Sequence, residues 1–324
     1  MPLDRPFLTY DQQIFRLQNI YNLNIQNEEL ALSALSTVSY YDLYNGYKNI
    51  FVKDNNFKEY VSFEYLFTFH IYNKNIQHLL FKYSSYAENS YKTNLSYFIA
   101  ETYSADHRKY LNIKNYKYPK DKKNRIKIKE LFYSLINTCY HCTDTPTSHY
   151  RKTKNHIPPW ILFRNVSFSN STDLFLFLKR KEKERILESN IILNSSNLSY
   201  DKKVEIYLNA LTIIRKYRNI IAHNLNFLSY NKCSINKEIS KCFHGILVNE
   251  NDDFGNFNNI WAYILSLILI LNNKVLVSTF INELITYLNT IDIFIREYCS
   301  ITKIPLDYEK RLKEYLKIYN KKCI

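Results

Sequence analysis

Glycine and proline are scarce in this sequence, with 3 and 7 copies among 324 residues. Folds rich in tight β-turns use both residues repeatedly to reach special backbone angles, so the scarcity argues against an all-β sandwich or barrel. Gly46, Gly245 and Gly255 are also too far apart, or wrongly spaced, for a P-loop or a G-x-G-x-x-G motif. Nucleotide binding of those two kinds is therefore excluded, and an all-α fold, a multi-helix bundle, is expected.

Long apolar runs and dense cysteines are absent as well. The longest apolar run, Ile260–Leu271, is shorter than the roughly 18 residues of a membrane span and predicts a buried helix. The N-terminal segment MPLDRPFLTYDQQ lacks the apolar core of a signal peptide. Six cysteines are too few for a secreted disulfide scaffold of this size. We therefore expect a soluble, cytoplasmic protein with reduced cysteines and no membrane partner.

Positive charge is in excess. Lysine and arginine number 44 against 30 aspartates and glutamates, a formal net charge of +14. A basic surface suits a partner that carries phosphates, such as RNA. An AT-rich coding sequence, which over-encodes Lys, Asn, Ile and Tyr, explains part of the same balance. The charge thus favours RNA without establishing it.

Apolar residues at helical spacing predict helices along most of the chain. Thr9 and Gln12 stand at the two positions of a capping box for a helix that begins at Tyr10. Gly46 is placed to end an aromatic helical segment over residues 40–47. Residues 63–103 are expected to hold two helices, and residues 200–224 form a clear amphipathic helix.

The domain organisation follows from two changes in composition. Residues 116–130 are basic and contain Pro119, which predicts a linker or solvated loop. We therefore expect an N-terminal helical region at 1–115, a basic linker at 116–130 and a second helical domain at 131–324, which carries Arg218 and His223. Residues 143–159 are expected to be irregular, and Ser171 or Thr172 is expected to cap a helix that runs into the charged segment KRKEKER.

One short motif carries chemistry. Arg218 is followed five positions later by His223, and on a helical wheel both belong to one polar face. That face comprises Arg215, Lys216, Arg218, Asn219 and His223, and the opposite arc comprises Ile213, Ile214, Tyr217, Ile220 and Ile221. Asn219 and His223 are four residues apart, so a direct hydrogen bond between them is expected.

Such a face suits metal-free cleavage of RNA, in which the 2′-hydroxyl attacks the adjacent phosphorus. A histidine near neutral pKa takes or gives the proton, and a guanidinium neutralises the growing phosphoryl charge. Two faces from two protomers would supply two proton carriers. The alternative is a solvated helix face with an incidental histidine, which is the commoner meaning of this spacing alone.

Two further groups are weaker candidates. His149, Arg151 and Lys152 lie in a basic stretch that suits RNA phosphates, although a solvated loop has the same composition. Cys139 and Cys142 have the C-x-x-C spacing of a zinc knuckle, but no second pair exists, so buried or incidental cysteines are favoured over a structural zinc. No metal ligand set and no cofactor is expected.

Several segments, in order, resemble the Abi-like proteins of the AbiD/AbiF type, which are bacterial abortive-infection proteins. The similar segments are PFLTYDQQ at 6–13, YYDLYNGY at 40–47, residues 63–103 with Glu88 and Lys92-Thr93, His149-Tyr150, Pro158-Pro159-Trp160, and Arg218-Asn219 with Ala222-His223. Together they are far more specific than any one alone.

The resemblance implies that the last segment is a HEPN domain, a helical ribonuclease module. It implies metal-independent endoribonuclease activity, with Arg218 and His223 as the catalytic pair and Asn219 as the polar residue beside them. It also implies a homodimer with the active site across the interface. Some members are associated with a small non-coding RNA, a second RNA partner besides the substrate. A non-catalytic RNA-binding or regulatory module of the same type is the alternative.

The chain departs from the family pattern at a few positions. Asp42 stands where Arg is usual, Asn45 where Ser is usual, and Ser169 where Gly often follows Phe. After His223 the family commonly has a further His or Asn and then Arg, whereas this chain has Asn224-Leu225-Asn226. The catalytic pair is intact, so these changes concern contacts around it.

Overall fold

The fold is built almost entirely of helices. The computed structural model describes residues 6–229, 239–243, 245–249, 252, 260–290 and 292–322. Within these ranges the only sheet is one antiparallel pair of two-residue strands, β1 (Val52–Lys53) and β2 (Asn56–Phe57). The predicted all-α class is confirmed. The helical elements are α1 (Tyr10–Tyr21), α2 (Glu28–Thr37), η1 (Tyr41–Asn45), α3 (Lys48–Phe51), α4 (Phe63–Tyr103), α5 (His107–Tyr110), η2 (Ile113–Asn115), α6 (Lys122–His141), α7 (Thr147–Thr153), α8 (Pro159–Asn165), α9 (Phe168–Phe177), α10 (Arg180–Glu188), α11 (Ile191–Asn194), α12 (Tyr200–Ala222), η3 (Phe227–Ser229), α13 (Ile239–Cys242), α14 (Ile260–Leu271), α15 (Lys274–Leu288), α16 (Asp292–Thr302) and α17 (Tyr308–Lys322).

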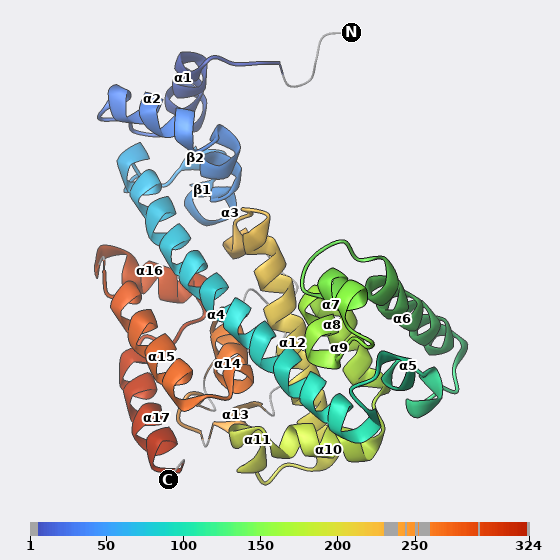
Figure 1. Ribbon diagram of the computed structural model, residues 1–324. Coiled ribbons are helices and arrows are strands. Elements are labelled where there is room, and N and C mark those ends of the chain that lie inside the picture. Colours follow the sequence, from blue (N-terminus) through green and yellow to red (C-terminus); the bar gives the residue numbers. More distant parts are fainter. Residues whose placement is uncertain are drawn as a thin grey trace.

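Helix α4 is the axis of the molecule. It runs for 41 residues, about 60 Å at 1.5 Å per residue, and crosses the whole molecule, with α1 and α2 at its N-terminal end (Figure 1). Ser62 caps it by accepting a hydrogen bond from the backbone N–H of Tyr65 at 3.2 Å. The prediction of two helices here was wrong, because the segment contains no glycine or proline that would break a helix.

Helix α14 fills the core between α4 and α12. All 12 of its residues are buried, and it packs against both helices. Trp261, at its start, donates its indole N–H to the carbonyl oxygen of Leu247 at 3.0 Å. The prediction of a buried helix at this apolar run is confirmed. In the part of the chain that the structure describes, no helix has the length and apolarity to cross a membrane.

Two stretches predicted as irregular are partly helical. Asp121 caps α6 by accepting a hydrogen bond from the backbone N–H of Asn124 at 2.9 Å, so residues 122–129, expected in the linker, form the first turns of α6. Helix α7 lies within the stretch 143–159. The first turns of α6 are basic and exposed, and His149 and Lys152 are exposed on α7, so composition alone could not distinguish these helices from solvated loops.

The predicted cap before the charged segment was also wrong. Ser171 and Thr172 are buried inside α9, where each donates its hydroxyl to the carbonyl oxygen of Phe168. The N-cap of α9 is Ser167, whose hydroxyl accepts from Asn170 at 3.1 Å. The charged segment forms a separate helix, α10, so one predicted helix is two.

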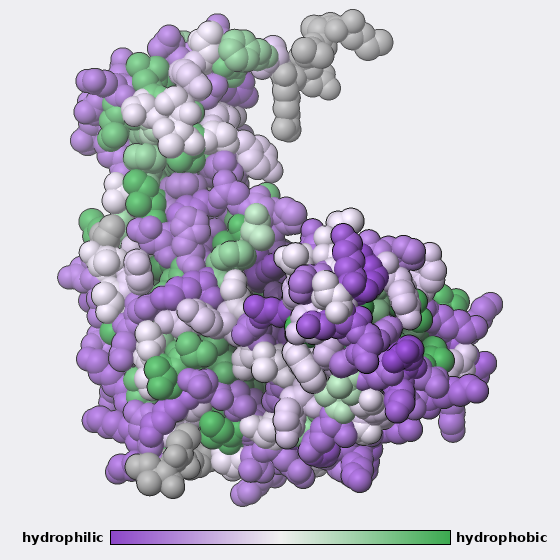
Figure 2. Space-filling model, viewed as in Figure 1, coloured by the Kyte–Doolittle hydropathy of each residue, from purple (hydrophilic) through white to green (hydrophobic). Residues whose placement is uncertain are grey.

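The hydrophobic core is continuous through the described chain. Buried residues from both predicted parts belong to one cluster, and α4 packs against α8, α12, α14 and α15. The surface in Figure 2 is largely hydrophilic, with hydrophobic side chains in small separate groups. The division at 116–130 stays a prediction about domains.

A buried polar cluster joins segments that are distant in sequence. The side-chain amide of Asn73, on α4, donates to the hydroxyl of Tyr47 at 3.1 Å and to the Asn226 side chain at 3.2 Å. Its carbonyl oxygen accepts from the hydroxyl of Tyr298, on α16, at 3.2 Å. Asn226 in turn donates to the backbone carbonyl of Gly46 at 2.7 Å. The cluster therefore fixes the chain just after α12 against α4 and the aromatic segment.

Gly46 ends the aromatic segment, as predicted. A glycine is needed there because other atoms of the protein lie close to its Cα, and not because of an unusual backbone angle. It is the C-cap of the π-helical turn η1 and has an ordinary φ of −62°. A Cβ added there would lie 2.1 Å from the carbonyl oxygen of Asp42 and 3.3 Å from the side-chain nitrogen of Asn226. Any larger residue would push the turn away from the Asn226 contact.

The buried His70 makes the stability of the fold depend on pH. Its Nδ1 lies 3.1 Å from the Tyr47 hydroxyl, and burial, helped by Lys74, lowers the pKa of His70 from 6.5 to about 4. The unfolded chain then binds this proton first as the pH falls, so the free energy of unfolding decreases between pH 6.5 and 4, by at most about 3 kcal/mol. Urea unfolding of the wild type and His70→Gln at pH 7.5 and 4.5 should show a smaller decrease in the variant. An equal decrease in both proteins would contradict this assignment.

Candidate functional site

Helix α12 has the two faces that the sequence predicts. It spans 23 residues, and Ile213, Ile214, Tyr217 and Ile221 are buried against the core. Ile220, predicted on the same arc, is half-buried. On the opposite side the exposure of the side chains increases towards the C-terminus. Arg215, Lys216 and Arg218 are half-buried, and Asn219 and His223 are exposed.

His223 stands at the end of the helix. It is the C-cap of α12, and its backbone N–H donates to the Asn219 carbonyl at 3.1 Å. The next residue, Asn224, has a left-handed φ of 57°, a conformation that asparagine tolerates well. The ammonium of Lys74 holds this turn through the Asn224 backbone and side-chain oxygens, at 3.1 and 2.9 Å. The imidazole is thus presented to solvent on a fixed backbone.

Asn219 does not make the predicted contact with His223. Its side-chain oxygen accepts a hydrogen bond from Nη1 of Arg218 at 3.2 Å. A charged guanidinium is a stronger donor than a neutral imidazole, so the neighbouring arginine takes the acceptor. In the structure Asn219 therefore orients Arg218 and leaves the His223 ring unrestrained by this amide.

Arg218 reaches back to α4. Its Nε lies 3.7 Å from a carboxylate oxygen of Glu88, and its guanidinium carbon lies 5.9 Å from the centre of the Phe81 ring. Glu88 also binds Lys92, one turn further along α4, at 2.6 Å. The distance of 3.7 Å exceeds that of a hydrogen bond, and the buried Nε of Arg218 has no hydrogen-bond partner.

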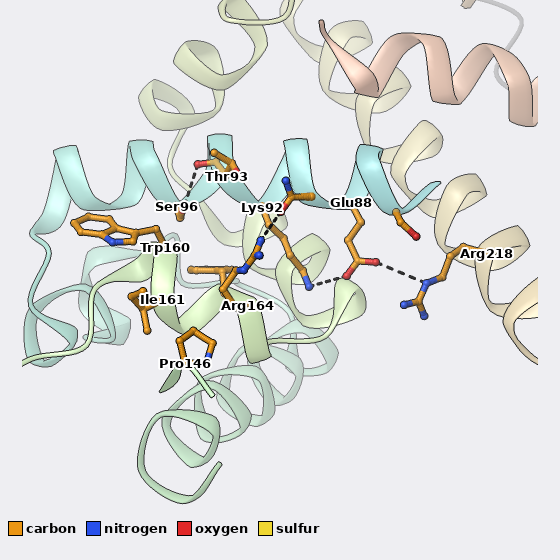
Figure 3. A pocket seen from close by; sticks show the side chains of 12 residues that line it. Glu88, Lys92, Thr93, Ser96, Pro146, Trp160, Ile161, Arg164 and Arg218 are labelled. Atoms are coloured by element: carbon orange, nitrogen blue, oxygen red, sulfur yellow. Dashed lines mark hydrogen bonds and ion pairs between the residues drawn. The ribbon is translucent and has the colours of Figure 1, made fainter. Parts of the chain in front are cut away.

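A pocket of about 430 Å³ opens beside Arg218. Residues of α4 and α8 form most of its wall, and Glu88 lies between Lys92 and Arg218 (Figure 3). The lining residues are Ser85, Glu88, Asn89, Lys92, Thr93, Ser96, Pro146, Trp160, Ile161, Phe163, Arg164 and Arg218. Glu88, Lys92, Thr93 and Trp160 come from two of the segments that carry the family resemblance, and all four line the same pocket as Arg218.

Arg215 and Lys216, predicted to bind RNA, are not among the residues that line this pocket. A guanidinium nitrogen of Arg215 donates to the hydroxyl of Ser169, the residue that stands where the family often has glycine. This bond joins α12 to α9. Lys216 is half-buried, and its predicted RNA contact stays a prediction.

Arg151 stabilises the C-terminal end of helix α6. Its guanidinium donates to the backbone carbonyls of Cys139 and Cys142, at 3.1 and 2.8 Å, and so caps the C-terminal end of α6. It is half-buried, whereas His149 and Lys152 are exposed on α7. Arg151, one of three residues on this segment predicted to contact RNA, therefore already binds backbone carbonyls of the protein itself.

The cysteine pair does not gather a ligand set. Cys139 is buried, and burial raises the pKa of its thiol to about 11, which disfavours the thiolate that zinc requires. Cys142 is half-buried. Across the described ranges no three His, Cys, Asp or Glu side chains lie close enough together to hold a metal ion. Cys233 lies outside those ranges.

Comparison with known proteins adds one finding. A sequence model described as "Abi-like protein" matches residues 33–229, which is more than half of the chain. No curated protein and no solved structure matches the chain. The matched range includes the aromatic segment, all of α4, the pocket and the end of α12, so it contains each element of the geometry above.

Proposed function

Because the chain belongs to the Abi-like protein family, which indicates abortive-infection defence, we propose that it is an RNA-cleaving effector of that defence. The reaction is metal-independent and of the HEPN type. The 2′-oxygen of the substrate attacks the adjacent phosphorus, the bond to the 5′-oxygen breaks, and a 2′,3′-cyclic phosphate remains. The 2′-hydroxyl proton passes to a base, and an acid protonates the departing 5′-oxygen.

The observation that carries the proposal is the polar end of α12. His223 is an exposed imidazole on a backbone fixed by Lys74 and by the Asn73 cluster, as a proton carrier requires. Arg218, on the preceding turn, donates one hydrogen bond to Asn219 and lies 3.7 Å from Glu88 in a loose ion pair. The Arg218 side chain is 36% exposed, so its outer guanidinium nitrogens can donate to a phosphoryl oxygen.

In-line attack needs a base and an acid on opposite sides of the phosphorus, and one copy of the motif holds one histidine. A second copy supplies the other, so we propose that the active form is a homodimer with the two α12 ends facing each other. Leu225, two residues after His223, is 52% exposed and next to a small pocket lined by the aromatic segment. An exposed leucine at this position provides apolar area for such a contact.

RNA cleavage by the purified full-length protein in excess EDTA tests the proposal. We expect cleavage to persist without free metal and each upstream product to end in a 2′,3′-cyclic phosphate, detected by mass spectrometry. Cleavage that EDTA abolishes would contradict the mechanism. Tight, salt-sensitive RNA binding without turnover would instead support the alternative, an RNA-binding or regulatory module, and co-purified RNA would then be sequenced to find a small RNA partner.

A further inference from the structure

The pocket beside Arg218 combines several charged side chains with an exposed aromatic ring. Its wall carries the cations of Lys92, Arg164 and Arg218 and the carboxylate of Glu88; three positive charges less one negative leave a net +2. The same wall holds the indole of Trp160, which is 49% exposed. Cations beside an accessible aromatic ring suit a ligand with an anionic group and a planar apolar group.

The cationic end is open to an anion. Glu88 binds Lys92 at 2.6 Å but stays 3.7 Å from Arg218, so the carboxylate satisfies the lysine and leaves the buried arginine Nε unbonded. The Arg218 side chain as a whole is 36% exposed and lines the pocket, so the outer nitrogens of its guanidinium can donate to a phosphate oxygen, a strong acceptor.

The aromatic end is set by α8. Trp160 and Arg164 are four residues apart on this helix, so both side chains belong to the same face. Nη1 of Arg164 donates to the Asn89 side chain at 2.6 Å, which holds that face against α4. The indole is thereby kept at the pocket wall, where a nucleobase of any sequence can stack on it.

The aromatic end and the cationic end of the pocket are far enough apart to hold a nucleotide between them. Figure 3 shows Trp160 at the Ser96 end of the pocket and Arg218 at the Glu88 end. Ser96 follows Glu88 by eight residues of α4, about 12 Å at 1.5 Å per residue. That span leaves room for a base at one end and its sugar and phosphate groups towards the other.

We propose that this pocket binds a nucleotide unit, with the base stacked on Trp160 and the phosphate held by Arg164 and Arg218. The proposal rests on the proposed function to the extent that both use Arg218. The nucleotide belongs to an RNA strand threaded past the cleaved bond or is a free mononucleotide. The recognition chemistry is the same for both sources.

Tryptophan fluorescence tests the base contact. The chain has 2 tryptophans, and Trp261 is only 1% exposed, so quenching by a stacked base reports on Trp160. The probes are AMP and a short single-stranded 2′-O-methyl oligoribonucleotide, which lacks the attacking hydroxyl and cannot be cleaved. We expect the oligonucleotide to quench the emission; quenching by AMP at similar affinity would assign the pocket to a free nucleotide, and its failure to do so would assign it to a strand.

Variants locate the contact. Trp160→Ala should weaken oligonucleotide binding, measured by anisotropy of a labelled strand, roughly 5- to 150-fold, and Trp160→Phe should restore most of it. Arg164→Ala should lower the slope of log affinity against log salt by about 0.7. Tyr133→Ala removes an aromatic ring that is 75% exposed on α6, outside the pocket, and should change neither quantity.

Unchanged emission at saturating oligonucleotide, or wild-type affinity in Trp160→Ala, would overturn the proposal, as would the absence of binding by both probes. The result is independent of turnover because the probe cannot be cleaved. Quenching in a protein that never cleaves RNA would refute the proposed function and leave the pocket standing. Cleavage without quenching would support the proposed function and refute nucleotide binding in this pocket.

Discussion

Replacing His223 by alanine is expected to lower the rate of RNA cleavage by about 10²–10⁴-fold, the usual worth of a positioned general acid or base. The loss arises in the chemical step, because the 2′-hydroxyl loses its proton acceptor or the 5′-oxygen its donor. The side chain is exposed at the C-cap of α12, so the fold should be unaffected. Single-turnover cleavage and thermal unfolding of the same preparation measure the two effects.

His141→Ala is the matched control for this experiment. His141 is also an exposed histidine at the C-terminal end of a helix, α6, but it lies outside the motif. It should cleave at the wild-type rate. A His223→Ala protein that cleaves as fast as His141→Ala, in preparations free of contaminating nuclease, would refute the role of His223.

The second large effect is expected at Arg218. Arg218→Lys keeps the charge but loses the planar fork that grips two phosphoryl oxygens, and removing one such stabilising group typically costs about 10²–10³-fold in rate. Arg218→Ala should lose at least as much. The arginine is half-buried, makes a loose ion pair with Glu88 and donates one hydrogen bond to the exposed Asn219, so the melting temperature should change little in either variant.

Arg180→Lys provides the comparison. Arg180, on α10, also pairs with a glutamate, Glu184, at 2.7 Å and lies over an aromatic ring, that of Tyr200, yet it is remote from the motif. Its replacement should leave cleavage unchanged. If Arg218→Lys also cleaves at the wild-type rate, the guanidinium geometry has no part in the reaction.

Local signals in the sequence predicted local structure well. The Thr9 and Gln12 capping box forms, with hydrogen bonds of 3.0 and 3.3 Å, because its two partners are three residues apart. The amphipathic helix predicted at 200–224 is α12, which ends two residues earlier. Its buried arc was predictable because the period of a helix places those residues on one face whatever the rest of the chain does.

Long-range contacts were outside the reach of the same reasoning. Glu88 and Arg218 are 130 positions apart, and nothing in either segment says that they meet at 3.7 Å. The ordered family resemblance named both, but only the fold shows them in one pocket. The predicted contact of Asn219 was wrong for a local reason. Helical spacing allowed a hydrogen bond to His223, but the neighbouring guanidinium of Arg218 is a stronger donor and binds the Asn219 side-chain oxygen instead.

The match to the family ends at residue 229, but the physical unit that holds the motif extends further. Asn73, which fixes the segment after α12, receives a hydrogen bond from Tyr298 on α16, and α14 covers the inner faces of α4 and α12. The matched range is thus shorter than the packed unit around the motif. A fragment cut at the family boundary would expose apolar faces to water and release the turn that carries His223. The motif therefore depends on helices that lie beyond the matched range.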